Sequence, residues 1–233
     1  TNTRNIWSFT VTAEDGVTTA VYTVTVNTAA LPEPITPGVD NKKPASKPEV
    51  KLPFTDVSTS DWFYDDVAFV YKNGLFSGTD SRSFSPNASM TRAMLVTVLY
   101  RLEGEPASTG SSSFSDVCSG SYYEKAVAWA AANGIVTGTD STSFSPDAKV
   151  TREQLAAILY RYAQYKKYNT AASSGLNGFT DHASVSGYAA ASLEWAVAEK
   201  LVNGSAGKLM PTGNATRAQV AAILHRFVTN VAK

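Results

Sequence analysis

Three arginines occupy the same position in three similar stretches of the sequence, each directly after a threonine. The pairs are Thr91-Arg92, Thr151-Arg152 and Thr216-Arg217, and they follow one another at intervals of 60 and 65 residues. Threonine is a favourable N-cap, so each arginine is predicted to be the first residue of a helix. Unpaired backbone N–H groups and the helix dipole favour an anion there, and a guanidinium can hold a carboxylate with two parallel bonds. These residues therefore suggest recognition of an anionic group.

An aspartate precedes each of these arginines in its own stretch of sequence. The three copies are Phe54-Thr-Asp56, Phe114-Ser-Asp116 and Phe179-Thr-Asp181, again at intervals of 60 and 65 residues. The alternative to ligand binding is that each arginine pairs with an aspartate and clamps the repeats together, because ion pairs of this kind are common. The residues by themselves leave both interpretations open.

Aromatic residues and glycines recur in the same register. The aromatic residues expected just before a helix are Trp62, Tyr122 and Tyr188. Their faces could stack on a sugar, whereas core packing is the better hypothesis for any one aromatic residue. A second aromatic set, Phe69, Trp129 and Trp195, falls inside the helix and is expected in the core. The glycines Gly78, Gly138 and Gly204 either admit a ligand closely or supply a positive φ at a turn, and the sequence does not decide between these roles.

Catalytic, metal-binding and nucleic-acid-binding functions are all disfavoured by the composition. The two histidines, His182 and His225, lie in one repeat, and Cys118 is the only cysteine. No nucleophile–base arrangement or metal-ligand spacing is found, so we expect neither an enzyme nor a cofactor or metal. Lys plus Arg and Asp plus Glu number 20 each, so no overall positive charge attracts nucleic acid. No apolar run is long enough for membrane insertion, and because the chain opens at Thr1 we expect it to be a fragment of a longer protein.

Each repeat is predicted to fold as helix, loop and helix. The second helices carry apolar stripes: Leu95, Val98, Leu99 and Leu102; Leu155, Ile158, Leu159 and Tyr162; and Val220, Ile223, Leu224 and Phe227. Because three equivalent stripes need one shared core, we expect a mainly helical pseudo-trimer around a central bundle of these three helices. A linear two-helix solenoid is the alternative.

The ends of the predicted helices carry further signals. Gln154 and Gln219 can complete capping boxes at the starts of the second helices, whereas Met94 cannot. First helices should stop at Asn73-Gly74 and Asn133-Gly134. The third repeat has Glu199-Lys200 instead, so we expect its helix end to be built differently.

The first 53 residues differ from the rest of the chain. Two runs in which apolar and polar residues alternate, around Trp7 and Val24, predict a β-hairpin over residues 1–30 with its turn at Glu14-Asp15-Gly16. Residues 31–53 contain six prolines and read as an extended linker. The predicted repeats cover residues 54–106, 107–168 and 169–233.

The repeats resemble the S-layer homology domain, which occurs as three tandem copies in bacterial cell-surface proteins. The family pattern has Phe-x-Asp-Val, an aromatic-rich first helix, a turn with Phe-x-Pro and the sequence Thr-Arg-Ala-Glu, and Phe84-Ser-Pro86 and Phe144-Ser-Pro146 match the turn. The resemblance implies a three-pronged pseudo-trimer that binds a secondary cell-wall polysaccharide, commonly pyruvylated, in grooves between repeats. The hairpin is similar to the last strands of cadherin-like or immunoglobulin-like modules.

This chain departs from the family pattern at several positions. The final Glu of Thr-Arg-Ala-Glu is replaced by Met94, Gln154 and Gln219. The third repeat has Leu209-Met210 in place of the turn phenylalanine, is one residue shorter there, and has His182 where Val is expected. We therefore expect its groove to be the weakest, and substitution of Arg217 to cost less binding energy than substitution of Arg152.

The resemblance and the residues together predict a non-catalytic anchor at the extracellular surface of the bacterial wall. Its ligand-binding residues would be the three arginines, the three aspartates, the three aromatic residues expected just before a helix and the three glycines named above. The alternative is a self-assembly module of a surface layer, with the same surfaces buried between chains. A hairpin that has lost its neighbouring strands could also pair with a second copy of itself, giving a homodimer caused by truncation.

Overall fold

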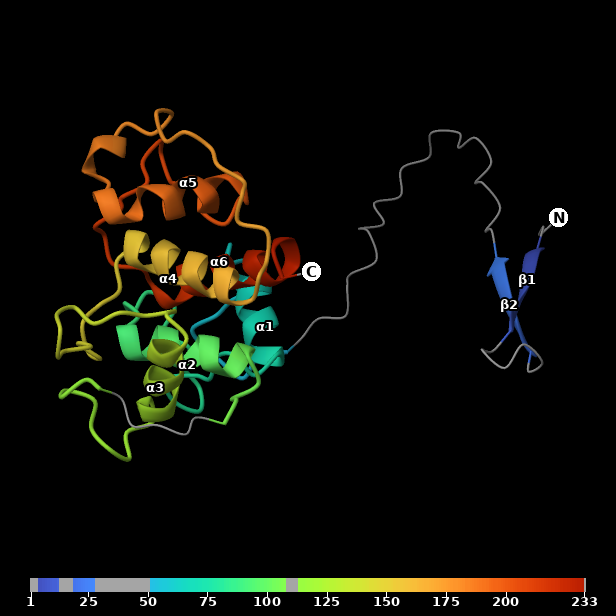
Figure 1. Ribbon diagram of the computed structural model, residues 1–233, viewed down its shortest axis with the longest axis horizontal. Helices are drawn as coiled ribbons and strands as arrows, with labels where there is room; N and C mark the ends of the chain where they lie inside the picture. Colours follow the sequence, from blue (N-terminus) through green and yellow to red (C-terminus); the bar gives the residue numbers. More distant parts are fainter. Residues whose placement is uncertain (1–3, 13–18, 28–50, 108–112, 233) are drawn as a thin grey trace. The chain divides into compact units, whose positions relative to one another are not determined.

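The computed structural model describes residues 4–12, 19–27, 51–107 and 113–232 of the chain (Figure 1). The chain divides into two parts, residues 1–49 and 50–233. In the first part, β1 (Arg4–Thr12) and β2 (Thr19–Asn27) pair antiparallel, with Trp7 opposite Val24 and Phe9 opposite Tyr22. These strands fall in the two runs where the sequence predicts them, and the hairpin as a separate unit over residues 1–30 stays a prediction. The predicted turn, most of the linker and the side chains of the hairpin lie outside the described residues.

The second part is helical, as predicted. Its α-helices are α1 (Tyr64–Lys72), α2 (Arg92–Leu102), α3 (Glu124–Ala132), α4 (Arg152–Tyr165), α5 (Ala190–Ala198) and α6 (Arg217–Asn230). Two short 3-10 helices, η1 (His182–Ser184) and η2 (Gly187–Ala189), precede α5. The predicted capping boxes with Gln154 and Gln219 are present at α4 and α6, and α2 has only the Thr91 cap. The apolar stripes are buried, apart from the partly buried Leu102.

Each first helix packs against the second helix of a different repeat. The pairs are α3 with α2, α5 with α4 and α1 with α6 (Figure 1). Two aromatic rings meet at each of these joints: Tyr100 with Trp129 at 5.6 Å, Tyr160 with Trp195 at 5.3 Å and His225 with Phe69 at 4.1 Å between ring centroids. The third repeat thus contacts the first, which makes the linear solenoid alternative wrong.

Backbone hydrogen bonds close the same cycle in the interior. Met90 donates its N–H to Ala215 O, Ala215 to Val150 O and Val150 to Met90 O, at 2.9, 2.9 and 3.0 Å. All three residues are fully buried. The repeats therefore form a closed ring of contacts. The symmetry of the ring and its central helical bundle stay predictions. The contacts show which repeats touch one another, but not that the three repeats are related by a symmetry axis.

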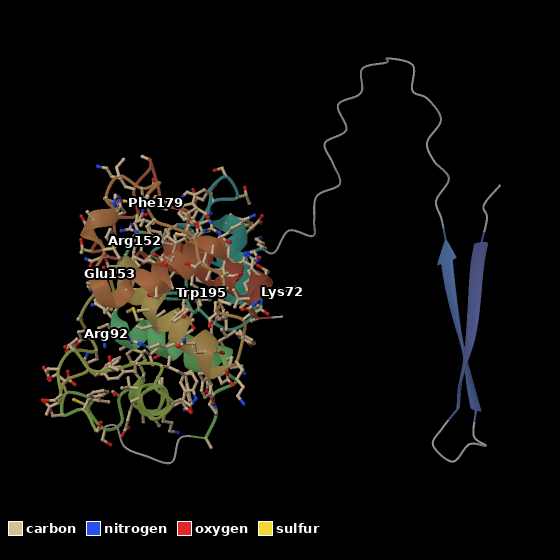
Figure 2. The ribbon with its side chains drawn as sticks, turned by 45° about the horizontal axis from the view of Figure 1, so that its top comes forward. Lys72, Arg92, Arg152, Glu153, Phe179 and Trp195 are labelled. Atoms are coloured by element: carbon tan, nitrogen blue, oxygen red, sulfur yellow. The ribbon has the colours of Figure 1, made fainter. Side chains whose placement is uncertain are left out.

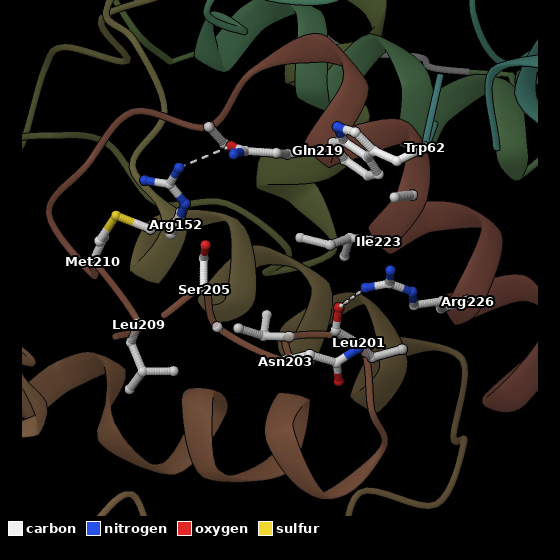
Figure 3. A pocket seen from close by; sticks show the side chains of 14 residues that line it. Trp62, Arg152, Leu201, Asn203, Ser205, Leu209, Met210, Gln219, Ile223 and Arg226 are labelled. Atoms are coloured by element: carbon white, nitrogen blue, oxygen red, sulfur yellow. Dashed lines mark hydrogen bonds between the residues drawn. The ribbon is translucent and has the colours of Figure 1, made fainter. Parts of the chain in front are cut away.

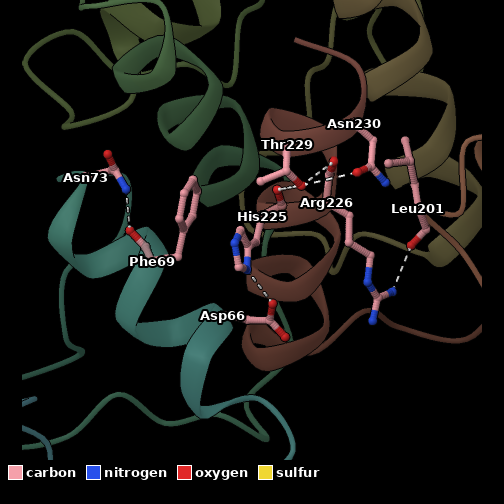
Figure 4. Close-up of polar contacts among 8 residues, drawn as sticks. All are labelled: Asp66, Phe69, Asn73, Leu201, His225, Arg226, Thr229 and Asn230. Atoms are coloured by element: carbon pink, nitrogen blue, oxygen red, sulfur yellow. Dashed lines mark hydrogen bonds and ion pairs between the residues drawn. The ribbon is translucent and has the colours of Figure 1, made fainter. Parts of the chain in front are cut away.

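The joint between α6 and α1 is the one that uses a histidine. His225 Nδ1 lies 2.8 Å from Asp66 Oδ1, and the His225 ring stacks on Phe69 (Figure 4). Trp129 and Trp195, at the matching positions of the other joints, are 4% and 1% exposed. Figure 2 shows Trp195 among the helices. These two residues are in the core, as predicted, and His225 is a structural variant of the tyrosines.

The end of α5 corrects one expectation. Lys200 has a φ of 57°, close to the 68° and 67° of Gly74 and Gly134. The same hydrogen bond closes each helix, from Leu201 to Ala196 O in the third repeat and from Leu75 to Val70 O in the first. The third helix end is therefore built in the same way as the others, and a lysine tolerates the left-handed backbone that glycine adopts there.

Candidate functional site: three grooves between the repeats

The backbone amides at the starts of the second helices are not free. Arg92 N–H donates to Ala148 O at 2.9 Å, and Ala93 N–H donates to Pro146 O at 3.0 Å. The same pair of bonds joins α4 to Gly213 and Pro211, and α6 to Ala88 and Pro86. Each helix start is thus a joint with the turn of another repeat. The expectation that these amides receive an anion is wrong, because the neighbouring turn supplies carbonyl acceptors instead.

The side chains of Arg92 and Arg217 reach beyond these joints to backbone carbonyls of another repeat. Arg92 donates from Nε to Phe144 O at 2.9 Å and from Nη2 to Thr137 O at 3.0 Å, and its guanidinium lies 4.7 Å from the centre of the Phe144 ring. Arg217 makes the corresponding bonds to Phe84 O and Ser77 O, both at 2.7 Å, and lies 4.6 Å from the Phe84 ring. Both side chains are therefore fixed by a repeat other than their own.

Arg152 is held differently. Its Nη2 donates to Gln219 Oε1 at 3.0 Å, and neither a carbonyl bond nor an aromatic ring holds it within the described residues. The reason lies in the third repeat, where Leu209 replaces the turn phenylalanine and the turn is one residue shorter. Without a ring to lie on, the guanidinium of Arg152 turns to a side-chain amide.

The three aspartates build the turns rather than pairing with arginine. Asp56 accepts the N–H groups of Phe84 and Ser85 at 2.8 and 2.7 Å. Asp116 does the same for Phe144 and Ser145, and Asp181 for Leu209 and Met210. No ion pair joins these aspartates to the helix-start arginines in the described part of the chain, so the aspartate–arginine pairing of the clamp alternative is wrong. The arginines do join the repeats, but through backbone carbonyls and Gln219. Their role as ligand contacts stays a prediction.

The aromatic residues before the first helices are exposed. Trp62, Tyr122 and Tyr188 have exposed fractions of 64%, 64% and 57%. The core-packing alternative is therefore wrong for all three. Tyr188 is oriented by its hydroxyl, which donates to Glu153 Oε1 at 3.2 Å, and Glu153 also accepts Ser186 N–H and Oγ–H at 3.0 and 2.8 Å.

The glycines are required by the loops themselves. A Cβ on Gly138 would lie 2.2 Å from Asp140 O and 2.8 Å from the Phe114 ring, and Gly78 is equally crowded. Gly204 has a φ of +68°, so it has the positive φ that was the second alternative. The loop backbone accounts for all three glycines without a ligand, although each also lines a cavity.

Three cavities bring these residues together, and each is named here after the repeat that supplies its loop and second helix. The first groove, about 410 Å³, is lined by residues that include Gly78, Met94, Arg101, Tyr122 and Arg217. The second, about 380 Å³, is lined by Arg92, Thr137, Gly138, Gln154, Arg161 and Tyr188 among others. The third, about 510 Å³, includes Trp62, Arg152, Gly204, Gln219 and Arg226 (Figure 3).

All three repeats contribute to every groove. One repeat supplies the loop and second helix, the following repeat in the cycle supplies the aromatic residue, and the preceding one supplies the helix-start arginine. Arg217 therefore belongs with the loop of the first repeat, and Arg152 with that of the third. Substitution of Arg217 was expected to cost less binding energy because the third repeat is irregular. That reason is wrong, because the irregular turn of the third repeat lines the groove of Arg152 and not that of Arg217.

Sequence reasoning missed one arginine in each groove. Arg101, Arg161 and Arg226 stand nine residues after the helix-start arginines, and each lines a groove. In Figure 3, Arg152 and Arg226 lie on opposite sides of the third groove. The signal that could have found these residues is the same triplicate spacing that found the helix-start arginines.

The residues that line each groove give it a positive charge. Each groove has two arginines and no aspartate or glutamate among its lining residues. Burial lowers the pKa of Arg92, Arg152 and Arg217. An arginine nevertheless stays protonated at neutral pH, so each groove offers two cations. Among the described residues, Glu105 is the one carboxylate within ion-pair distance of the groove arginines; it lies 4.0 Å from Arg101 and is not a lining residue.

The fold and the grooves define a helical three-repeat protein with composite cationic sites. The comparison with known families matches residues 53–93, 113–156 and 178–221 to the S-layer homology domain, together more than half of the chain. The chain belongs to this family. No described helix has both the length and the apolar character needed to cross a membrane.

Relatives of the chain are larger proteins. An endoglucanase of Bacillus sp. (strain KSM-635) is 32% identical over 78% of this chain and 19% of its own length. A surface-layer 125 kDa protein of Lysinibacillus sphaericus is 34% identical over 46% of this chain and 10% of its own. A cellulosome-anchoring protein of Acetivibrio thermocellus is 26% identical over 47% of this chain and 26% of its own. The chain spans about a fifth of the endoglucanase's length and a tenth to a quarter of the other two.

Family membership places the chain at the bacterial cell surface with a cell-wall anchoring role. The S-layer homology domain is a non-catalytic anchoring module that binds cell-wall polymers, and the endoglucanase matches the chain in this region only.

Proposed function

We propose that the three grooves bind a secondary cell-wall polysaccharide that carries carboxylate groups, as a pyruvylated polymer does. The observation that carries this proposal is that every groove contains two arginines and no acidic lining residue. A cation that is partly withdrawn from water, in a groove whose lining has no acidic residue, favours an anionic ligand.

The exposed aromatic residue of each groove supports a carbohydrate as the carrier of that anion. Trp62, Tyr122 and Tyr188 are more than half exposed and lie beside the arginines. An aromatic face that is open to solvent can cover the C–H surface of a sugar ring. Carboxylate recognition and sugar stacking can then occur in one groove.

The composite construction has a consequence for anchoring. Since each groove takes residues from all three repeats, an isolated repeat should not bind. Three grooves on one chain can also engage three points of one polymer, so avidity adds to the affinity of each groove.

Purified wall sacculi test the proposal. The chain should sediment with sacculi that carry the secondary polymer and stay in solution after that polymer has been removed chemically. Equal sedimentation with both preparations would contradict the proposal. If the chain instead forms sheets or filaments by itself and ignores the sacculi, the self-assembly alternative is correct.

A further inference from the structure

The three arginines on the second helices are not equivalent. Arg101 donates to Leu75 O at 3.3 Å and lies 4.0 Å from Glu105, and Arg226 donates to Leu201 O at 3.2 Å (Figure 4). Arg161, at the same position of the second repeat, has no hydrogen bond or ion pair with any described residue. Among these three arginines, and within the part of the chain that the structure describes, Arg161 is therefore the one whose N–H donors are all available to a ligand.

The opposite side of the second groove is rigid. Arg92 is 6% exposed and is fixed by two carbonyl bonds and by the Phe144 ring. Neither bond uses its Nη1. The second groove therefore combines one fixed guanidinium and one free guanidinium, and at about 380 Å³ it is the smallest of the three cavities. Two like charges facing the same small space repel each other, and an anion between them relieves that repulsion.

The aromatic residue of this groove is oriented in advance. The Tyr188 hydroxyl is bound by Glu153, a 5% exposed carboxylate that is held in turn by Ser186. Glu153 is not among the groove-lining residues, so it orients the ring from outside the groove and does not occupy the space open to a ligand. A ring that is already in place loses less conformational entropy when a sugar stacks on it.

We propose that the second groove is the principal ligand groove of this chain, where a glycan residue bearing a carboxylate is held between Arg92 and Arg161 and lies on Tyr188. This inference rests on the proposed function and adds to it an order among the grooves and a deciding residue, Arg161. The first groove should bind the ligand less tightly, because its second-helix arginine, Arg101, already donates a hydrogen bond within the protein. The third groove is last, because Arg152 is engaged by Gln219 and lacks an aromatic support.

Calorimetry with a small probe tests the order. The probe is a methyl glycoside with a 4,6-linked pyruvate ketal, and the control ligand is the corresponding ethylidene acetal, which lacks the carboxylate. Arg161→Gln should weaken probe binding to the whole chain tenfold or more without changing the melting temperature, since no internal bond is lost. The matched variants Arg101→Gln and Arg226→Gln should each weaken it threefold or less.

The outcomes separate this inference from the proposed function. If the wild-type chain binds the probe and the Arg161 variant loses no more than the Arg101 variant, the order of grooves is wrong and the proposed function stands. If the wild-type chain binds neither the probe nor polymer-bearing sacculi, both fail. If it binds sacculi only, the same three variants are compared on sacculi with the same expected order. Tighter binding of a matched sugar 6-phosphate than of the ketal would overturn the carboxylate assignment.

The role of Tyr188 gives a second measurement. Tyr188→Phe keeps the ring and loses the bond to Glu153, so we expect a two- to threefold loss of probe affinity. Tyr188→Ala removes the ring and should cost tenfold, against threefold or less for Tyr122→Ala. Equal losses for Tyr188→Ala and Tyr122→Ala would contradict the assignment of the principal groove.

Discussion

The second and third grooves are built from corresponding positions of the repeat, yet their cations are held in different ways. In the second groove, Arg92 lies over Phe144 and donates to two backbone carbonyls. In the third, Arg152 donates to the side chain of Gln219, and Leu209 stands where the other turns have phenylalanine. A backbone acceptor is fixed by the fold, whereas a side-chain acceptor can rotate. The turn phenylalanine of one repeat therefore determines how firmly the arginine of another repeat is held.

The largest difference should come from glycines that border the two grooves. Gly138→Ala places a Cβ 2.2 Å from Asp140 O, so the loop must move, and we expect a loss of about 4 kcal/mol in unfolding free energy. Gly213→Ala places a Cβ 2.4 Å from Arg152 Nη1, the end of a flexible side chain, and should cost less than about 1 kcal/mol. Urea denaturation measures both. A similar loss for the two variants would mean that the loops are equally rigid.

Replacing the arginines tests their fixation directly. Arg92→Ala leaves two carbonyls without their donor and removes the contact with Phe144, so it should lower the unfolding free energy by about 3 kcal/mol. Arg152→Ala loses one bond to a partly exposed amide and should cost about 1 kcal/mol. Thermal and urea unfolding of the two proteins would show the difference. Equal costs would remove the distinction between the grooves.

A smaller effect is expected at the helix end beside the third groove. Lys200 is exposed and has a φ of 57°, so Lys200→Gly should raise the unfolding free energy by about 0.5–1 kcal/mol. Gly134→Ala is the matched reverse change, because Gly134 has a φ of +67° and a Cβ there would touch nothing within 4 Å. It should destabilise the protein by a similar amount. If Lys200→Gly is destabilising, its side chain makes a contribution that the backbone argument omits.

The smallest effect concerns acid stability of the turn in the third repeat. Burial alone would raise the pKa of Asp181, but the amides of Leu209 and Met210 outweigh it, so the pKa is lowered. A lowered folded-state pKa gives stability that is present above about pH 4 and lost as the pH falls through the folded value. Asp181→Asn should therefore be less stable at neutral pH and show a flatter decline below pH 4. An unchanged slope in acid urea titrations would contradict this.

The sequence by itself determined the elements and the residue types of the grooves. Triplicate spacing predicted the helices and the Thr caps, because caps and apolar stripes are local signals. Anion binding by Arg92, Arg152 and Arg217 stays a prediction. The same register contained Arg101, Arg161 and Arg226, which could have been selected from their spacing. The exposure of Trp62, Tyr122 and Tyr188 could not, since an aromatic residue has the same type in a core and in a groove.

Only the tertiary structure decided which residues share a groove. Sequence reasoning judged Arg217 by the irregular loop of its own repeat, whereas the cycle of contacts passes each helix-start arginine to another repeat. The structure also shows that carbonyl groups of neighbouring turns accept the helix-start amides. Each aspartate accepts amides of the turn in its own repeat. The physical reason is that caps and turns are satisfied by residues nearby in sequence, while a closed ring of repeats is held by contacts up to 159 residues apart, which no local pattern specifies.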